Sequence, residues 1–216
     1  RVRFAQPVAV IAYGTGGHLR RHVLSSPQSQ VTLARSAPAG TYLVSATPRT
    51  WESARASVVS WFPSGAGASA VALPAPGSQI DPNTPITLTF SKPVAQALGS
   101  SRPPVVPITA GTWHTVNSHT IVFEPQGYGY GLGAAVKIGL PSGIQLVGAQ
   151  KYGSAPSATW NVPGGSTVRL QQLLATLGYL PLNFTTSGSS VAMTPAAQEG
   201  AAIHAPAGTF SWRWGN

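Results

Sequence analysis

The sequence predicts a mainly β protein, with two small β-sandwich units followed by a short helical segment. Short runs of β-branched and aromatic residues recur along the chain and are separated by turn-forming residues. Gly supplies 24 and Pro supplies 20 of the 216 residues, which is typical of β proteins with many turns. A single stretch has the apolar spacing of an amphipathic helix, so helix is expected to be the minor component.

The first expected unit covers residues 1–63. Its β-branched and aromatic runs predict strands at 8–13, 30–33, 41–46 and 57–62. Gly14–Gly17 is interpreted as a turn, because the next residues lack the helical stripe that would follow a phosphate-binding loop. Residues 64–77 are rich in Ser, Gly and Ala, so we expect a linker between two separately packed β units.

The second expected unit covers residues 78–162. Ile86, Leu88 and Phe90 alternate with threonines, which predicts a strand whose three apolar side chains point inward. Further strands are expected at 120–123, 135–140, 144–147 and 159–162. Strands that recur about every ten residues, with turn signals between them, favour a sandwich.

Four leucines in the last part of the chain, residues 163–216, share one helical face. They are spaced at i, i+3, i+4 and i+7, at Leu170, Leu173, Leu174 and Leu177. The expected helix covers about 166–178 and ends at Gly178, a residue suited to a helix C-terminus. On periodicity alone this is a core helix. The polar and small residues of 183–209 predict a long loop, and residues 210–214 predict a strand-like end.

The charge balance favours anionic partners. Lys and Arg number 13 against four acidic residues, a formal net charge of +9. Nucleic acid, peptidoglycan carboxylates, wall polymers and anionic lipid head groups are all compatible with this charge. The densest basic cluster is Arg20–Arg21 with His18 and His22, and no basic run alternates with aromatic residues. We therefore expect no nucleic-acid partner.

The residue types disfavour catalysis by this chain. There is no cysteine, so cysteine nucleophiles, disulfides and thiolate metal sites are excluded within it. The four carboxylates are spread along the sequence, at Glu52, Asp81, Glu124 and Glu199. No histidines show a convincing metal-ligand spacing. We expect no catalytic residue, no metal and no cofactor.

Two further expectations concern the chain's context. No apolar run reaches the roughly 18 residues that a membrane-spanning helix needs, so no transmembrane segment is expected. The sequence begins at Arg1 rather than Met, which suggests a processed form or a fragment. Any signal peptide would then already be missing.

Three aromatic residues are candidates for stacking on sugar rings, because aromatic faces match the axial C–H surfaces of carbohydrates. They are Trp113, Tyr128 and Tyr130, of which the two tyrosines lie in a glycine-rich loop. For Trp113 the alternative is a structural position in the core or at the edge of the sandwich, and we favour that alternative.

Two stretches resemble known bacterial families. The helix of residues 164–181, ending Leu177-Gly178-Tyr179-Leu180-Pro181, is similar to the first helix of the peptidoglycan-binding domain of cell-wall enzymes. Residues 86–94, 111–113 and 120–125 resemble successive strands of bacterial immunoglobulin-like domains. That second resemblance implies an immunoglobulin-like sandwich over 78–162, and the first unit is interpreted as a more diverged β domain of the same kind.

The order of these units resembles the non-catalytic N-terminal region of actinobacterial L,D-transpeptidases, where a catalytic domain with a nucleophilic Cys lies further C-terminal. The later helices of the wall-binding module are missing from residues 163–216, so that module is partial.

The resemblance implies a secreted, cell-wall-associated targeting and spacer region that is itself non-catalytic, within a peptidoglycan cross-linking protein. Its partner would be peptidoglycan or an anionic cell-wall polymer, contacted by Arg169, Gln172 and Tyr179. The alternative function is a secreted adhesin or structural surface protein built from immunoglobulin-like domains.

Overall fold

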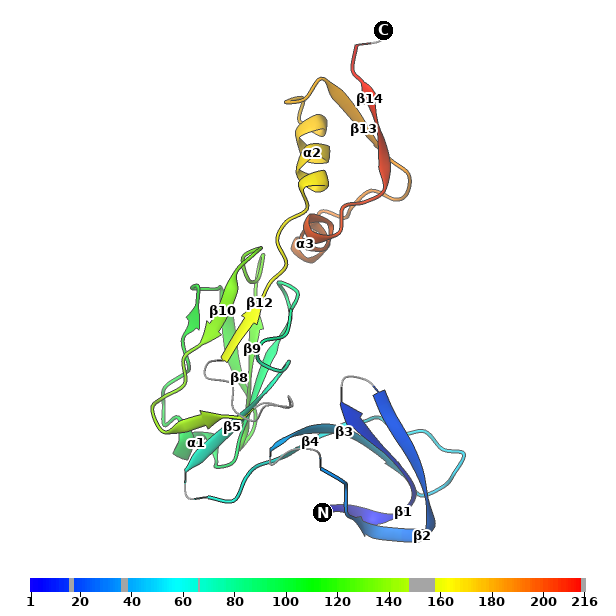
Figure 1. Ribbon diagram of the computed structural model, residues 1–216, viewed down its shortest axis with the longest axis vertical. Helices are drawn as coiled ribbons and strands as arrows, with labels where there is room; N and C mark the ends of the chain where they lie inside the picture. Colours follow the sequence, from blue (N-terminus) through cyan, green and yellow to red (C-terminus); the bar gives the residue numbers. More distant parts are fainter. Residues whose placement is uncertain (16–17, 36–38, 66, 148–157, 215–216) are drawn as a thin grey trace.

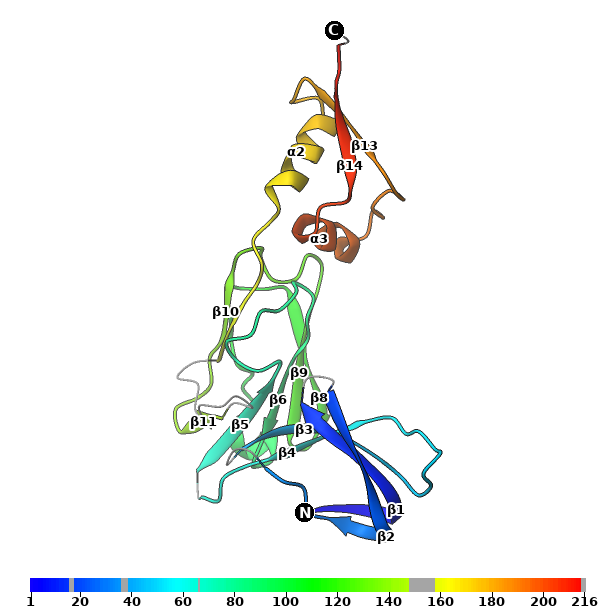
Figure 2. The ribbon, with the colours of Figure 1, turned by 45° about the vertical axis from the view of Figure 1, so that its right-hand side comes forward.

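A computed structural model describes residues 1–15, 18–35, 39–65, 67–147 and 158–214 (Figure 1). The chain is mainly β with a short helical segment, as the sequence predicts. The chain has three parts: an N-terminal sheet, a β-sandwich and a C-terminal helix–hairpin module. The sandwich and the C-terminal module follow one another along the longest axis, and the N-terminal sheet lies beside the end of the sandwich that is remote from that module (Figures 1 and 2). The two ends of the chain therefore lie far apart in the views.

The N-terminal sheet contains four antiparallel strands in the order β2-β1-β3-β4. They are β1 (Val2–Thr15), β2 (His18–Val31), β3 (Gly40–Thr47) and β4 (Ser57–Trp61). The described residues of 1–63 thus form one sheet, not two facing sheets of their own. Strand β2 was not expected along most of its length because it is polar. As an edge strand it can stay exposed and can accommodate Pro27.

The hairpin between β1 and β2 explains one glycine of the expected turn. Thr15 pairs with His18, and a Cβ added at Gly14 would collide with the His18 carbonyl oxygen. Gly14 itself belongs to β1, and Gly16 and Gly17 lie outside the described residues. A larger residue at position 14 would therefore disturb this end of the hairpin.

The sequence-based linker at 64–77 is wrong over residues 68–73, which form strand β5 (Ala68–Leu73). This strand lies inside a sheet of order β11-β5-β6-β9-β8, between a parallel and an antiparallel neighbour. Ala70 and Ala72 are fully buried in the sandwich core. The small side chains of this segment are therefore packed, and the exposed connection shrinks to the few residues before Ala68.

The sandwich faces this five-stranded sheet with a second sheet of order β12-β10-β7. Ile86, Leu88 and Phe90 point into the core as predicted, and Trp160 is buried opposite them. The remaining elements are β6 (Ile86–Phe90), α1 (Val94–Ala97), β7 (Val105–Val106), β8 (Gly111–Asn117), β9 (Thr120–Pro125), β10 (Ala135–Ile138), β11 (Ile144–Leu146) and β12 (Ala158–Asn161).

The C-terminal module holds the predicted helix, α2 (Thr167–Thr176), and more structure than expected. The loop expected over 183–209 is wrong, because that range contains a second helix and parts of a β-hairpin. Thr194 caps the second helix through its hydroxyl, and Pro195 occupies its first turn, a start signal that was readable in the sequence. These elements are β13 (Leu182–Thr186), α3 (Pro195–Ile203) and β14 (Gly208–Trp212).

Each junction between neighbouring parts has its own contacts. Phe62 packs on a small buried cluster of Ala39, Val71 and Val147, which joins the N-terminal sheet to the sandwich. At the other end, the Asn83 side-chain amide donates a hydrogen bond to the Glu199 carboxylate of α3. The C-terminal module therefore touches the sandwich through α3.

Candidate functional site

The structure separates the three predicted sugar-stacking residues. Trp113 in β8 is half-buried, packs at 5.3 Å from Phe123 and donates its indole N–H to the Pro103 carbonyl at 3.0 Å. Trp113 therefore has the structural position in the sandwich that we favoured over sugar stacking. Tyr128 is exposed on the loop after β9 and keeps its ring accessible.

The prediction for Tyr130 needs correction. Its side chain is 1% exposed and belongs to the sandwich core, and burial raises the pKa of its phenol well above the ordinary value. Its backbone N–H donates to the Pro82 carbonyl at 2.9 Å, and Gly129 adopts a positive φ of 60° just before it. This turn directs the ring inward, so Tyr130 is not available to a carbohydrate.

The three predicted peptidoglycan contacts also differ from one another. Gln172 is 2% exposed, and its side-chain amide donates to the Pro206 carbonyl at 2.8 Å. The prediction that Gln172 contacts peptidoglycan is therefore wrong, because this side chain holds parts of the module together from inside. Arg169 is partly buried and donates to the Gln198 side chain at 3.2 Å, linking α2 to α3. Tyr179 is freely exposed beyond the end of α2.

Helix α2 is anchored at both ends. The Ser166 hydroxyl accepts a hydrogen bond from the Arg169 backbone N–H at its start. At its end, Gly178 adopts the left-handed conformation, with φ of 82°. The Ala175 carbonyl in the last turn accepts the Gly178 backbone N–H at 3.1 Å and also the Arg213 guanidinium at 2.8 Å, which places a cation at this end of the helix.

Three of the four leucines in the predicted stripe of α2 face away from the module's own packing, and the fourth, Leu174, is half-buried. The buried residues of the helix are Gln172 and Ala175, on the side next to β13 and α3. On the opposite side, Leu170, Leu173 and Leu177 are 55%, 40% and 70% exposed. The stripe is therefore not the core face of this helix, as periodicity alone suggested, but an uncovered apolar surface.

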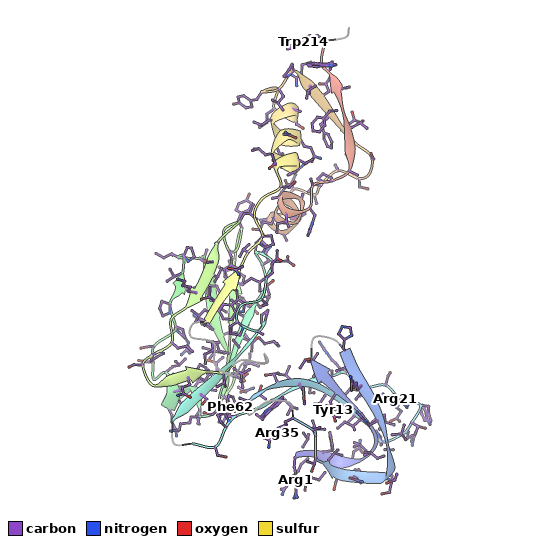
Figure 3. All side chains as sticks on the ribbon, viewed as in Figure 1. Arg1, Tyr13, Arg21, Arg35, Phe62 and Trp214 are labelled. Atoms are coloured by element: carbon purple, nitrogen blue, oxygen red, sulfur yellow. The ribbon has the colours of Figure 1, made fainter. Side chains whose placement is uncertain are left out.

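Aromatic side chains extend this exposure at the same end of the module. Trp212 and Trp214 are both exposed, and Arg213 between them contacts the C-terminal end of α2. The two tryptophans therefore lie near the end of the helix that carries Leu177 and Tyr179, and Figure 3 shows Trp214 at the extremity of the molecule. We call these residues the C-terminal apolar set: Leu170, Leu173, Leu177, Tyr179, Trp212 and Trp214.

The sequence pointed to only part of this set. Tyr179 is a predicted peptidoglycan contact, whereas the leucine spacing predicts a core helix and residues 210–214 predict only a strand-like end. The signal that was available is the pair of tryptophans around Arg213 close to a helix that carries no charged residue on its leucine face.

Three of the four acidic side chains take part in local contacts, in different parts of the molecule. Glu52 pairs with Arg49 at 3.7 Å, and Glu124 lies 3.4 Å from His114 on the sandwich surface. Glu199 is buried at the junction with the sandwich, and loss of solvation raises the pKa of its carboxyl. Within the described ranges, no three His, Asp or Glu side chains gather as metal ligands would.

Among the described residues, none of the helices combines the length and hydropathy required to cross a bilayer. No family model matches this sequence, and no curated protein is significantly similar to it.

Partial likeness was found to solved structures of L,D-transpeptidases. The enzyme LdtMt1 in complex with imipenem is 19% identical over 43% of this chain and 38% of its own length, with a TM-score of 0.31. An L,D-transpeptidase from Mycobacterium tuberculosis H37Rv is 15% identical over 43% of this chain and 38% of its own length, with a TM-score of 0.30. An L,D-transpeptidase from Mycobacterium smegmatis is 15% identical over 43% of this chain and 37% of its own length, also with a TM-score of 0.30.

This chain thus spans less than two fifths of the length of those three proteins. Likeness of this extent, at such low identity, does not assign the chain to a family.

Proposed function

We propose that this chain is a non-catalytic docking and spacer region of a secreted, cell-wall-associated protein of the peptidoglycan cross-linking, L,D-transpeptidase type. The observation that carries the proposal is the outward leucine stripe of α2 together with the exposed Tyr179, Trp212 and Trp214. The same segment resembles the first helix of a peptidoglycan-binding domain, which points to wall glycopeptide as the partner.

The chemistry of the C-terminal apolar set suits a glycan strand with peptide stems. Aromatic rings can lie against the C–H faces of sugar rings, as interface aromatics do when one side is apolar and the other is wet. Arg169 is close by on α2 and can attract the carboxylates of the stems through its charge. The overall charge of +9 adds a non-specific attraction that salt weakens.

The two β parts supply the spacer. They precede the docking module along the chain, and the sandwich separates that module from the N-terminal sheet in both views (Figures 1 and 2). The sandwich has a continuous buried core that includes Trp160 and Phe90. Because this core is close-packed, the sandwich is a rigid spacer of fixed length. In the intact protein this length would set the distance between the wall-bound module and whatever precedes it.

The docking part is tested by sedimentation with purified peptidoglycan across a salt series. We expect the wild-type chain to be retained partly at high salt, because apolar stacking is not screened. Tyr179→Ala and Trp212→Ala should release it at moderate salt. The matched control is Trp51→Ala, which removes an exposed ring from the N-terminal part of the chain, and Tyr128→Ala tests the exposed ring in the sandwich that the sequence predicts as a sugar-stacking candidate.

Equal retention of all four variants at every salt concentration would contradict docking through the C-terminal apolar set. Loss of all binding at moderate salt by the wild-type chain would leave only adsorption of a basic protein. If the chain is retained on a cell-surface preparation but not on purified peptidoglycan, the alternative function as a secreted adhesin or structural surface protein is favoured instead.

The non-catalytic part of the proposal has a separate test. Purified chain is incubated with labelled muropeptides, and the products are separated by chromatography. We expect neither cross-linked nor released fragments, because the chain has no Cys and three of its four acidic side chains engage in the local contacts described above. Any enzyme-dependent product would overturn this expectation.

A further inference from the structure

One face of the N-terminal sheet carries a continuous ladder of rings. His22 stacks on Tyr13 with ring centroids 5.1 Å apart and an interplanar angle of 23°. Tyr13 contacts Tyr42 at 5.5 Å, and Tyr42 contacts Trp61 at 4.6 Å. The four residues come from β2, β1, β3 and β4, so the ladder crosses the whole sheet.

The strand register places cations beside this ladder. Tyr13 pairs with Arg20, and Thr15 pairs with His18, so these side chains share the ring-bearing face. Arg21 pairs with Ala12 and therefore points to the opposite face, where it donates to the Thr50 carbonyl at 2.6 Å. Two adjacent arginines thus serve different faces of one sheet.

A hollow of about 630 Å³ opens over Tyr13 and Tyr42. Besides these rings and His22, it is lined by Arg20, Arg35 and His18, with no carboxylate among the described lining residues. Figure 3 labels Tyr13 and Arg35, which both belong to this hollow. Its volume lies in the range of small-molecule sites.

Two local features hold this arrangement in place. The Tyr42 hydroxyl donates to the Ala34 carbonyl at 3.1 Å, which fixes the segment that carries Arg35 next to the sheet. Trp61 lies across Gly40, where an added Cβ would come within 2.8 Å of the indole ring. The ladder therefore depends on a glycine that leaves room for its last ring.

We propose that this hollow binds a sugar ring that carries a carboxylate or phosphate group. Tyr13, His22 and Tyr42 line the hollow and supply aromatic surface for the C–H face of the sugar. Arg20 and Arg35 supply the planar, permanently charged donors that suit carboxylate and phosphate oxygens. This site lies on a different part of the chain from the C-terminal apolar set, and it does not depend on the proposed function.

The charge distribution supports an anionic ligand at this end. Seven of the ten arginines lie in residues 1–63, against a single acidic residue, Glu52, which pairs with Arg49 instead. No other part of the chain has such an imbalance.

The geometry favours a saccharide over a nucleic acid. Single-stranded nucleic-acid sites present separate ring platforms along a basic groove that follows several nucleotides. Here the rings already contact one another, and the cations gather around one hollow rather than along a track. One or two sugar units fit this shape better than a run of stacked bases.

The test is a titration of the full-length wild-type chain followed by amide chemical shifts, at one low ionic strength. The probes are glucuronic acid, glucose 6-phosphate, glucose, inorganic phosphate and a short oligothymidylate. We expect both anionic sugars to shift the amides of Tyr13, Arg20 and His22 in a saturable way, with glucose and phosphate much weaker. Their relative affinities decide whether the natural source is a carboxylated or a phosphorylated glycan.

The variants are Arg20→Gln, His22→Ala and the control Arg21→Gln. We expect Arg20→Gln and His22→Ala to lower the affinity for the tighter-binding anionic sugar about tenfold. Arg20→Gln removes a charged contact, and His22→Ala removes part of the aromatic surface. Arg21→Gln should bind like the wild-type chain, because its side chain lies on the other face. Unchanged amide spectra outside the hollow check that each variant is folded.

Four results would overturn the proposal. Equal weakening by Arg20→Gln and Arg21→Gln would indicate diffuse charge, and equal affinity for glucose would remove the role of the cations. Inorganic phosphate binding as tightly as glucose 6-phosphate would show that no sugar is recognised. Tighter binding of the oligothymidylate would identify the hollow as a nucleic-acid site.

Discussion

Asn83 of the sandwich donates a side-chain hydrogen bond to the carboxylate of Glu199, 116 residues further along the chain. Glu199 is buried in α3, and its second carboxylate oxygen, Oε1, has no hydrogen-bond partner. Loss of solvation raises the pKa of this carboxyl, and the bond from Asn83 offsets the effect only in part. The junction between the sandwich and the C-terminal module is therefore sensitive to one proton.

Replacing Glu199 with Gln is expected to stabilise the chain at neutral pH. The folded state holds the Glu199 proton more tightly than the unfolded chain does, because its folded pKa is raised. The protonated Glu199 carboxyl therefore contributes fully to the stability of the folded chain below the ordinary pKa of Glu. This contribution is lost as the pH rises through the raised folded-state pKa. The Tm difference between Glu199→Gln and wild type should be largest near pH 7 and should shrink toward pH 4.5.

The control for this prediction is Glu52→Gln, which removes a partly exposed carboxylate whose partner at 3.7 Å, Arg49, lies at the surface. It should change Tm little at any pH, because exposed ion pairs contribute about 0–1 kcal/mol. A pH-independent difference between Glu199→Gln and wild type would contradict the role of the buried carboxyl.

Replacing Arg213 with Ala is expected to loosen the end of α2. The guanidinium donates to the Ala175 carbonyl at 2.8 Å and to the Leu182 carbonyl at 3.4 Å, so its loss leaves two carbonyls without a cation. Because Arg213 is exposed, we expect a cost of only about 0.5–1 kcal/mol. Hydrogen exchange should accelerate at the amides of Leu177 to Tyr179, and Arg102→Ala should leave those amides unchanged.

Strand β5 should resist proteases although its composition is that of a linker. Ala70 and Ala72 are buried; Ala70 is paired on both sides, by β11 and by β6, and Ala72 is paired with β6. Elastase, which cleaves beside small residues, should cut at Ser64 or Gly65 and in the exposed loop 187–193, but not within 69–72. Early cleavage within 69–72 would contradict the placement of this strand in the sandwich.

Replacing Trp160 with Phe is expected to destabilise the sandwich. The indole is fully buried and donates its N–H to the Pro74 carbonyl at 2.9 Å, linking β12 to the end of β5. Phe removes the donor and leaves a void, for a combined cost of about 2–3 kcal/mol. Urea unfolding followed by circular dichroism measures it, and Trp51→Phe, at an exposed position, should be near neutral.

Local patterns were sufficient for several elements. The alternation of Ile86, Leu88 and Phe90 identified β6 and its inward face, and the leucine spacing identified α2 within two residues at each end. Such patterns succeed because backbone propensity and periodicity act over a few neighbouring residues. The mainly β character follows from the same signals summed over the chain.

Composition alone could not distinguish a flexible segment from a packed one. The residues of β5 are small and resemble a linker, and they become a core strand only because β6 and β11 lie beside them. Tyr130 shows the same dependence, since its burial follows from a turn whose amide binds Pro82 about fifty residues earlier in the chain.

Local sequence signals were enough to predict that α2 is a helix, that it begins near Ser166 and that four leucines share one of its faces. Which face is covered depends on tertiary contacts. Gln172 binds a carbonyl 34 residues away at Pro206, and Arg213 binds Ala175 38 residues away, so the polar face turns inward. Likewise, pairing between β1, β2 and β3 brought Tyr13, His22 and Tyr42 together. Contacts between distant residues select among faces that are locally equivalent, and no short-range pattern encodes that choice.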